Sequence, residues 1–90
     1  MVVTHSILRD LYFGDLPQLD MHGARTAEVS GRIDDFLDPF LISGGYVRIV
    51  GGAGQWKVMP AIERHLSYLR AKKRITDFWQ EATASFIVRI

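Results

Sequence analysis

The sequence predicts an α/β fold: a two-layer sandwich in β-α-β-α-β-β order, with a mixed four-stranded sheet. Two amphipathic helical patterns alternate with strand-like runs, and two more strand-like runs follow the second helix. Strands joined through a helix are parallel with a right-handed crossover, which is expected for the first pair. The last two runs are separated by a short turn, so we expect them to form an antiparallel hairpin.

Length and composition limit the chain to one small domain. It has 90 residues, of which 48% are hydrophobic and 23% are charged, as is typical of a globular protein with a single core. No apolar run reaches the ~20 residues of a membrane span, so no membrane partner is expected. The chain has no cysteine, which excludes disulfides and thiolate metal sites and fits the cytoplasmic location that we expect. Because the net charge is only +1, any nucleic-acid surface must be a local patch.

We expect residues 1–17 to be an N-terminal extension and residues 18–90 to be the domain. Within the extension, four apolar residues recur at helical spacing. They are Ile7, Leu8, Leu11 and Tyr12. Two alternatives remain open for the extension: a short helix over residues 4–14, or a disordered segment that packs loosely.

A carboxylate and an imidazole follow one another at the end of the first predicted strand, residues 18–22. Because side chains alternate between the two faces of a strand, Asp20 and His22 point to one face and their apolar neighbours to the other. Gly23 then allows a sharp turn of the backbone. This arrangement presents an acid and a histidine together where the strand ends.

The next segment has the pattern of an amphipathic helix, with Thr26 as the expected N-cap. Its apolar stripe consists of Val29, Ile33, Phe36, Leu37 and Phe40. Pro39 should end the helix near Asp38, since proline removes a helical hydrogen bond. A final turn would then stop at Gly44 and Gly45.

The second half of the chain begins with a β-branched strand, residues 46–50, bounded by glycines. A second helix is expected to begin at residues 57–59 and to end near residues 70–72, because Pro60 is tolerated only in a first turn. Its apolar stripe consists of Ile62, Leu66 and Leu69. The closing strands are predicted at residues 74–80 and 85–90.

Candidate chemistry gathers at one edge of the predicted sheet. The carboxyl ends of two parallel strands meet at the same edge, where open α/β sheets bind ligands. One strand supplies Asp20 and His22, and the other leads into a loop with Gly51, Gly52 and Gly54. Backbone N–H groups of such a loop, followed by a helix N-terminus, favour a phosphate. The alternative is structural: the Asp20 carboxylate accepts a hydrogen bond from the backbone two residues on, and the glycines only form a turn.

Further candidates lie outside this edge. A basic run provides phosphate contacts or, alternatively, a solvated helix end. Its charged residues are Arg70, Lys72, Lys73 and Arg74. Trp56 either stacks on a base or packs the glycine loop against the helix. Phe78 and Trp79 must point to opposite faces of their strand, and His65 has no evident carboxylate partner, so we interpret it as structural.

Three segments together resemble the small MutS-related (Smr) domain family. They are LDMHG at residues 19–23, FLDPFL at 36–41 and VRIVGGAG at 47–54. Members of this family share an LDxHG motif and, after the second strand, an HGxG motif. The resemblance implies an α/β sandwich and endonuclease activity on branched or nicked DNA, or on RNA, including messages on stalled ribosomes. DNA repair or recombination and ribosome quality control are therefore the implied processes.

By position, Asp20 and His22 match the acid and the histidine that the family ties to cleavage, and Gly52 and Gly54 match the glycines of HGxG. The chain departs from the family at several places. Gln55-Trp56 replaces the usual Thr-Gly, and the terminal hairpin turn is short where the family often has a longer glycine-rich loop. Gly51 stands where the family has the histidine of HGxG, and Met59 replaces a commonly basic residue. The resemblance therefore leaves two alternatives, a weakened endonuclease and a non-catalytic module that binds nucleic acid, a ribosome or a partner protein.

The expected function is cleavage of phosphodiester bonds. His22 acts as general acid and base, and Asp20 orients it or helps to hold a metal ion. The loop from Gly51 to Gly54, together with Gly23, holds the scissile phosphate. Neighbouring phosphates would contact Arg25, Lys57 and the basic run. RNA offers its own 2′-hydroxyl as nucleophile and needs no metal, whereas DNA requires an activated water and Mg²⁺ or Mn²⁺. The expected partners are DNA or RNA and also a ribosome or a larger parent protein.

Overall fold

The computed structural model describes residues 16–52 and 57–90 and confirms the expected α/β architecture. The predicted helix over residues 4–14 lies outside the described residues. The elements are β1 (Gln18–Asp20), the 3-10 turn η1 (Thr26–Glu28), α2 (Val29–Leu37), the 3-10 turn η2 (Asp38–Phe40), β2 (Tyr46–Val50), α3 (Val58–Ala71), β3 (Asp77–Ala82) and β4 (Ser85–Arg89).

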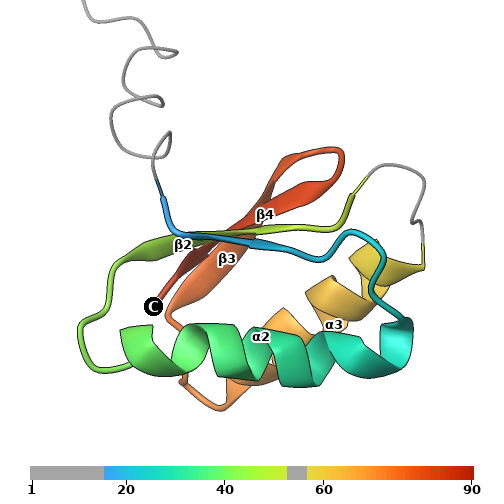
Figure 1. Cartoon of the computed structure of the whole chain (residues 1–90). Helices are drawn as coiled ribbons and strands as arrows, with labels where there is room; N and C mark the ends of the chain where they lie inside the picture. Colours follow the sequence, from blue (N-terminus) through green and yellow to red (C-terminus); the bar gives the residue numbers. More distant parts are fainter. Residues whose placement is uncertain (1–15, 53–56) are drawn as a thin grey trace, which may run out of the picture.

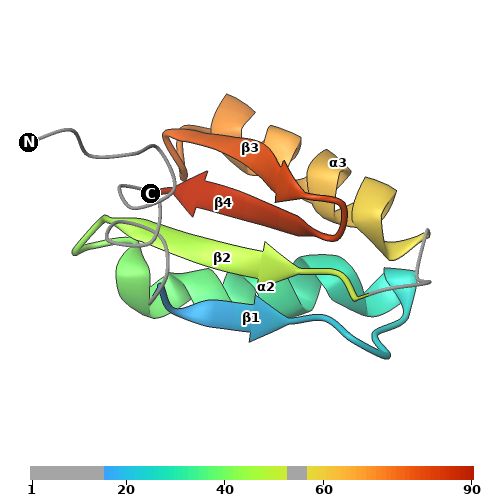
Figure 2. The ribbon, with the colours of Figure 1, turned by 90° about the horizontal axis from the view of Figure 1, so that it is seen from above.

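The four strands form one mixed sheet in the order β1-β2-β4-β3. β1 runs parallel to β2, with Leu19 opposite Ile49, and β4 is antiparallel to both β2 and β3. Figure 2 shows β1 and β2 pointing the same way, so that their carboxyl ends lie at one end of the sheet. Both helices pack against the same face of the sheet, which gives the expected two layers (Figure 1).

The core lies between the helices and this face of the sheet. The predicted apolar stripes of both helices point into it, and the inward side chains of the two central strands meet them. The helical members are Val29, Ile33 and Leu37 from α2 and Ile62, Leu66 and Leu69 from α3. Val47, Ile49, Phe86 and Val88 come from β2 and β4. Among the described residues, no helix combines the length and the apolar character that crossing a membrane requires.

The first strand is shorter than predicted, since β1 ends at Asp20 and not at residue 22. The reason is a local turn: the Asp20 Oδ1 atom accepts a hydrogen bond from the backbone N–H of His22, at 2.8 Å. The Ala24 N–H then donates to the Met21 carbonyl, at 2.9 Å, and Gly23 has a positive φ of 78°. These bonds turn the chain away from the sheet before His22 can pair.

The start of the first helix also differs from the prediction. Thr26 does not cap α2; it begins the turn η1, and neither η1 nor α2 has a side-chain cap hydrogen bond. The predicted end is confirmed, because α2 stops at Leu37 and Pro39 lies in η2. The Gly44 N–H closes this turn by donating to the Phe40 carbonyl, at 2.8 Å.

The third strand begins at Asp77, three residues later than predicted, because the chain first closes the C-terminus of α3. The Lys73 N–H donates to the Arg70 carbonyl and the Arg74 N–H donates to the Leu69 carbonyl, at 3.0 and 2.9 Å. This pair of bonds is the Schellman motif, whose central residue adopts a left-handed conformation. Lys73 occupies that position with a φ of +60°.

Replacing Lys73 with glycine should therefore stabilise the protein. A left-handed conformation costs an L-residue roughly 1–2 kcal/mol, and the greater freedom of glycine in the unfolded chain offsets part of the gain. We expect Lys73→Gly to raise the free energy of unfolding by about 0.5–1 kcal/mol in urea denaturation. Lys72→Gly, at a residue with a φ of −84°, is the matched control and should bring no gain. A Lys73→Gly protein that unfolds more easily than the wild type contradicts the prediction.

Candidate functional site

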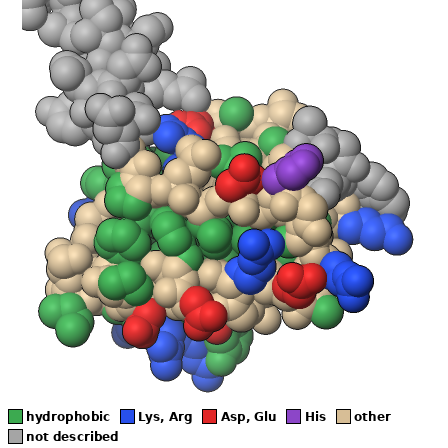
Figure 3. Space-filling view, in the orientation of Figure 1, with side chains coloured by type: hydrophobic (Ala, Val, Ile, Leu, Met, Phe, Trp, Pro, Cys, Tyr) green, Lys and Arg blue, Asp and Glu red, His purple; other side chains and the backbone are tan. Residues whose placement is uncertain are grey.

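The carboxyl ends of β1 and β2 bring Asp20, His22, Gly51 and Gly52 together. Asp20 is opposite Val50, the last residue of β2, and the Met21 N–H extends the pairing by donating to the Val50 carbonyl, at 2.7 Å. The chain leaves both strands at this point, so the residues that follow them lie next to each other. In Figure 3 a histidine side chain and an acidic one lie side by side on the surface of the molecule.

Contact between the two strand ends is made by His22 and Gly52. A Cβ atom built on Gly52 would lie 3.2 Å from the His22 Nδ1 atom and 3.4 Å from its Cα atom. Gly52 also has a φ of +85°, which L-residues with side chains rarely adopt. Because residue 52 has no side chain, the His22 imidazole can pack directly against the backbone of the loop.

Asp20 acts on His22 through the backbone. Its carboxylate accepts the His22 N–H in the turn described above, and both residues are exposed. The hydrogen bond of the structural alternative is therefore present, and Asp20 stabilises the turn that follows β1. This turn also bears on the candidate site, because it determines where the backbone of His22 leaves the sheet.

Gly51 is buried, and the space next to it is filled by α3. Its N–H donates to the Ala84 carbonyl, at 2.7 Å. A Cβ atom at residue 51 would lie 2.6 Å from the Met59 Sδ atom and 3.6 Å from the Ile62 Cδ1 atom. Two of the departures from the Smr pattern, Gly51 and Met59, are therefore in contact, and the methionine occupies the place into which a side chain at residue 51 would extend.

This contact predicts coupled effects on stability. Gly51→Ala should lower the free energy of unfolding by about 1–3 kcal/mol through overpacking against Met59. Met59→Ala alone should cost about 2 kcal/mol, and it also creates room for the new methyl group. In urea denaturation of all four proteins, the double variant should be less destabilised than the sum of the single variants by about 1 kcal/mol. Purely additive costs would show that the two residues do not compete for this space.

The remaining candidates at this end of the sheet are exposed. Gly23 lies in the turn after β1, and the Arg25 side chain is 87% exposed, with its Nε atom 4.0 Å from a Glu28 carboxylate oxygen. Lys57 immediately precedes α3 and is exposed as well. Gly54 and Trp56 lie outside the described residues, so their predicted roles remain predictions.

The basic run lies at the opposite end of α3. A helix of 14 residues is ~20 Å long, so this run does not meet the Asp20–His22 edge. Arg70 pairs with the Asp77 carboxylate, at 3.1 Å, and its guanidinium lies 4.8 Å from the centre of the Phe78 ring. The backbone N–H of Phe78 and, next, the Arg70 guanidinium hold the pKa of Asp77 below its usual value. The Lys72 Nζ atom lies 5.8 Å from the centre of the Tyr68 ring.

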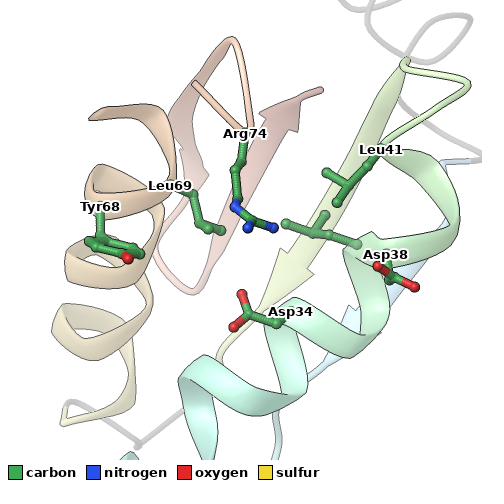
Figure 4. Close-up of a pocket in the computed structure, with 7 residues that line it drawn as sticks. Asp34, Asp38, Leu41, Tyr68, Leu69 and Arg74 are labelled. Carbon is green, nitrogen blue, oxygen red and sulfur yellow. The ribbon is translucent and has the colours of Figure 1, made fainter. Parts of the chain in front are cut away.

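Arg74 lines a separate pocket between α2 and α3, with a volume of about 220 Å³ (Figure 4). Its guanidinium extends between the two helices, towards the side of α2 that carries Asp34 and Asp38. The basic run is therefore not one continuous positive surface: Arg70 is paired, and Arg74 has acidic neighbours.

The partner of His65 is a residue that no sequence pattern indicated. The His65 Nε2 atom lies 2.7 Å from the Asp34 Oδ1 atom, and the His65 ring stacks on Tyr68 with 5.9 Å between the ring centres. The pair joins α3 to α2 across 31 positions of the chain. Only the packing of the two helices reveals it, since nothing local in the sequence links these residues.

A metal site is not evident at the candidate edge. Within residues 16–52 and 57–90, no three His, Asp or Glu side chains converge in a way that could hold a metal ion. Asp20 and His22 alone would supply two donors, and one Asp20 oxygen already accepts a backbone hydrogen bond.

The chain was also compared with known proteins. No protein-family model, curated protein or solved structure gave a significant match. The Smr resemblance thus stays a prediction that depends on the motifs themselves and on the fold in which they lie.

Proposed function

We propose that this chain is an Smr-like endonuclease domain that cleaves a phosphodiester bond at the carboxyl ends of β1 and β2. The observation that supports this most is the contact of the His22 imidazole with Gly52, which follows the neighbouring parallel strand. It places a group that can transfer a proton beside a backbone turn that a phosphate can approach closely. The exposure of Asp20 and His22 suits a polymeric substrate that lies across the surface.

The proposed reaction on RNA needs no metal ion. The His22 imidazole removes the proton of a 2′-hydroxyl, and the 2′-oxygen forms a bond to the adjacent phosphorus. The bond from phosphorus to the 5′-oxygen breaks, and the 5′-oxygen leaves with a proton from water. His22 then returns its proton to solvent. The products are a 2′,3′-cyclic phosphate and a 5′-hydroxyl. Arg25 and Lys57 hold neighbouring phosphates, and residues 70–74 contact phosphates farther along the strand.

The activity can be tested with the full chain on single-stranded RNA, nicked DNA and branched DNA, each with and without a chelator. We expect RNA cleavage that the chelator does not change and a terminal cyclic phosphate on the product. Cleavage of DNA that the chelator abolishes would assign the domain to metal-assisted hydrolysis of DNA instead. Failure to cleave any of the three substrates overturns the proposal of an endonuclease.

Two substitutions of Asp20 separate its roles. An asparagine side chain keeps an oxygen that accepts the His22 N–H, so Asp20→Asn should retain RNA cleavage to within about threefold if the residue acts by positioning His22. Asp20→Ala removes the acceptor and should lower the rate by about 10²-fold, because small displacements of a catalytic group are costly. Single-turnover cleavage measures both. Equal losses in the two variants would show that the negative charge, and not the turn, matters.

A second candidate function is binding of nucleic acid without cleavage. The contact between Gly51 and Met59 favours it, since the place of the second family histidine is filled by packing. This module would bind RNA or DNA with an affinity that falls steeply with salt, and it would cleave neither. Binding that is insensitive to salt would indicate a protein partner instead.

A further inference from the structure

The turn between β3 and β4, residues 83–84, lies at the same end of the sheet as the candidate site. One row of paired residues, one from each strand, crosses the sheet at this end. From β1 to β3 the row consists of Asp20, Val50, Ser85 and Ala82. Figure 2 shows the β3–β4 turn at the end where β1 and β2 have their carboxyl ends. This turn is therefore a third segment at the site, beside the turn at His22 and the loop at Gly52.

A backbone hydrogen bond joins the β3–β4 turn to the glycine loop. The Gly51 N–H donates to the Ala84 carbonyl, at 2.7 Å, and Gly51 is buried. The residue that follows, Gly52, contacts the His22 imidazole. Because Gly51 and Gly52 are neighbours in the chain, the position of the Ala84 carbonyl also affects where Gly52 meets the imidazole.

The side chain of Gln80 holds the β3–β4 turn. Its Nε2 atom donates to the Ala82 carbonyl, at 2.9 Å, and to the Thr83 carbonyl, at 3.2 Å. Both partners are acceptors, so the nitrogen of the amide and not its oxygen must face the turn. The two hydrogens of this nitrogen match the two carbonyls, which fixes the backbone immediately before Ala84.

The pairing of β3 with β4 is irregular next to this turn. Gln80 is opposite Phe86, but Ala82 and not Glu81 is opposite Ser85, so β3 contains one extra residue. Such a bulge interrupts the regular ladder of backbone hydrogen bonds and bends the strand. Side chains provide bonds at this interruption, since Gln80 donates to the turn and Glu81 accepts from the Ser85 hydroxyl at 3.1 Å. The geometry of the turn therefore depends on side-chain hydrogen bonds.

We propose that Gln80 is a positioning residue for the candidate site. By holding the two preceding carbonyls of the turn it places the carbonyl of Ala84, which anchors Gly51. This anchor in turn fixes the loop against which the His22 imidazole packs. The effect of Gln80 on cleavage rests on the endonuclease activity proposed above, whereas its effect on the backbone of Gly51 can be measured without any activity.

The first test follows the hydrogen exchange of single backbone amides in the full chain. Gln80→Met keeps the length of the side chain and adds no charge, but it has no N–H to donate. We expect the Gly51 amide to exchange about tenfold faster in this variant, because its acceptor is no longer fixed. The Thr76 N–H, which donates to the Arg89 carbonyl at the other end of the hairpin, should keep its exchange rate.

Asp77→Ala is the matched control for this test. It removes two hydrogen bonds that the Asp77 carboxylate accepts, from Arg70 and from the Phe78 N–H, at the beginning of β3. It should leave the exchange rate of the Gly51 amide unchanged. A Gly51 amide that exchanges at the wild-type rate in Gln80→Met overturns the proposal. Equal acceleration of the Gly51 and Thr76 amides in Gln80→Met also overturns it, because the loss of stability is then general.

The second test asks whether the change at Gly51 reaches the imidazole. In Gln80→Met the NMR signals of the His22 ring should shift, whereas those of His65, which pairs with Asp34 on the helical layer, should not. Unshifted signals of the His22 ring overturn the proposal, since Gln80 would then stabilise only its own turn.

The third test measures cleavage of RNA by the full chain. Gln80→Met should lower kcat about tenfold and leave KM within about twofold, because the imidazole is displaced while the groups that bind neighbouring phosphates remain. An unchanged kcat in this variant overturns the proposal. If the wild-type chain cleaves no substrate, the endonuclease function fails, and the exchange of the Gly51 amide and the signals of the His22 ring decide the role of Gln80 by themselves.

Discussion

Replacing His22 with alanine is expected to lower the rate of RNA cleavage by about 10²–10⁴-fold. The imidazole is the proposed base for the 2′-hydroxyl, and it lies against the backbone of Gly52, where the phosphate would bind. The other described histidine, His65, cannot replace it, since it pairs with Asp34 on the helical layer. The measurement is single-turnover cleavage of a labelled RNA at saturating protein.

His65→Ala is the matched control for this prediction. It should leave the cleavage rate unchanged and lower the stability, because it removes the contact with Asp34 between α2 and α3. Binding of a non-cleavable RNA should persist in His22→Ala, as only the proton transfer is lost. An unchanged cleavage rate in His22→Ala would remove this residue from the mechanism.

The second large effect concerns stability. Glu81→Ala is expected to lower the free energy of unfolding by about 3 kcal/mol, because it leaves the Arg48 guanidinium, 15% exposed, without its carboxylate. Arg48 cannot avoid the cost by losing its proton, because an arginine side chain stays protonated in proteins even without a carboxylate partner. Thermal and urea denaturation of the full chain measure the loss.

The control is a double replacement. Arg48→Met with Glu81→Leu removes both charges and keeps apolar volume, so it should restore most of the lost stability or exceed that of the wild type. Arg70→Ala breaks the exposed pair with Asp77 and should have a much smaller effect than Glu81→Ala, since exposed ion pairs are worth little. Equal losses of stability in Glu81→Ala and Arg70→Ala would show that the burial of an ion pair does not determine its contribution.

Elements with a strong local pattern could be predicted from the sequence. The β-branched run and its flanking glycines indicated the bounds of β2, and the position of Pro60 indicated the start of α3. The parallel pairing of β1 with β2 followed from the helix between them. The proximity of His22 to Gly52 followed in turn, because parallel strands end at the same edge of a sheet.

The errors arose where a side chain or a distant residue competes with the local pattern. Asp20 ends β1 early by accepting a backbone hydrogen bond, and the left-handed Lys73 delays β3. The contacts of Gly51 with Met59, and of His65 with Asp34, depend on how α3 packs on the sheet and on α2. No spacing in the sequence encodes such contacts, since they exist only after the layers have assembled.

Among the described strands, β1 and β3 lie at the two sides of the sheet, each with one edge that no other described strand pairs with. Such edges can recruit a strand from another molecule and begin a fibre. Here β1 has only three residues, and the pairing of β3 with β4 is irregular between Gln80 and Ala82. A strand from another molecule could form only a few backbone hydrogen bonds with β1. Along β3 the irregular pairing would interrupt the regular spacing of such bonds. The turn at Asp20 that shapes the candidate site therefore also helps to keep neighbouring molecules from joining sheet to sheet.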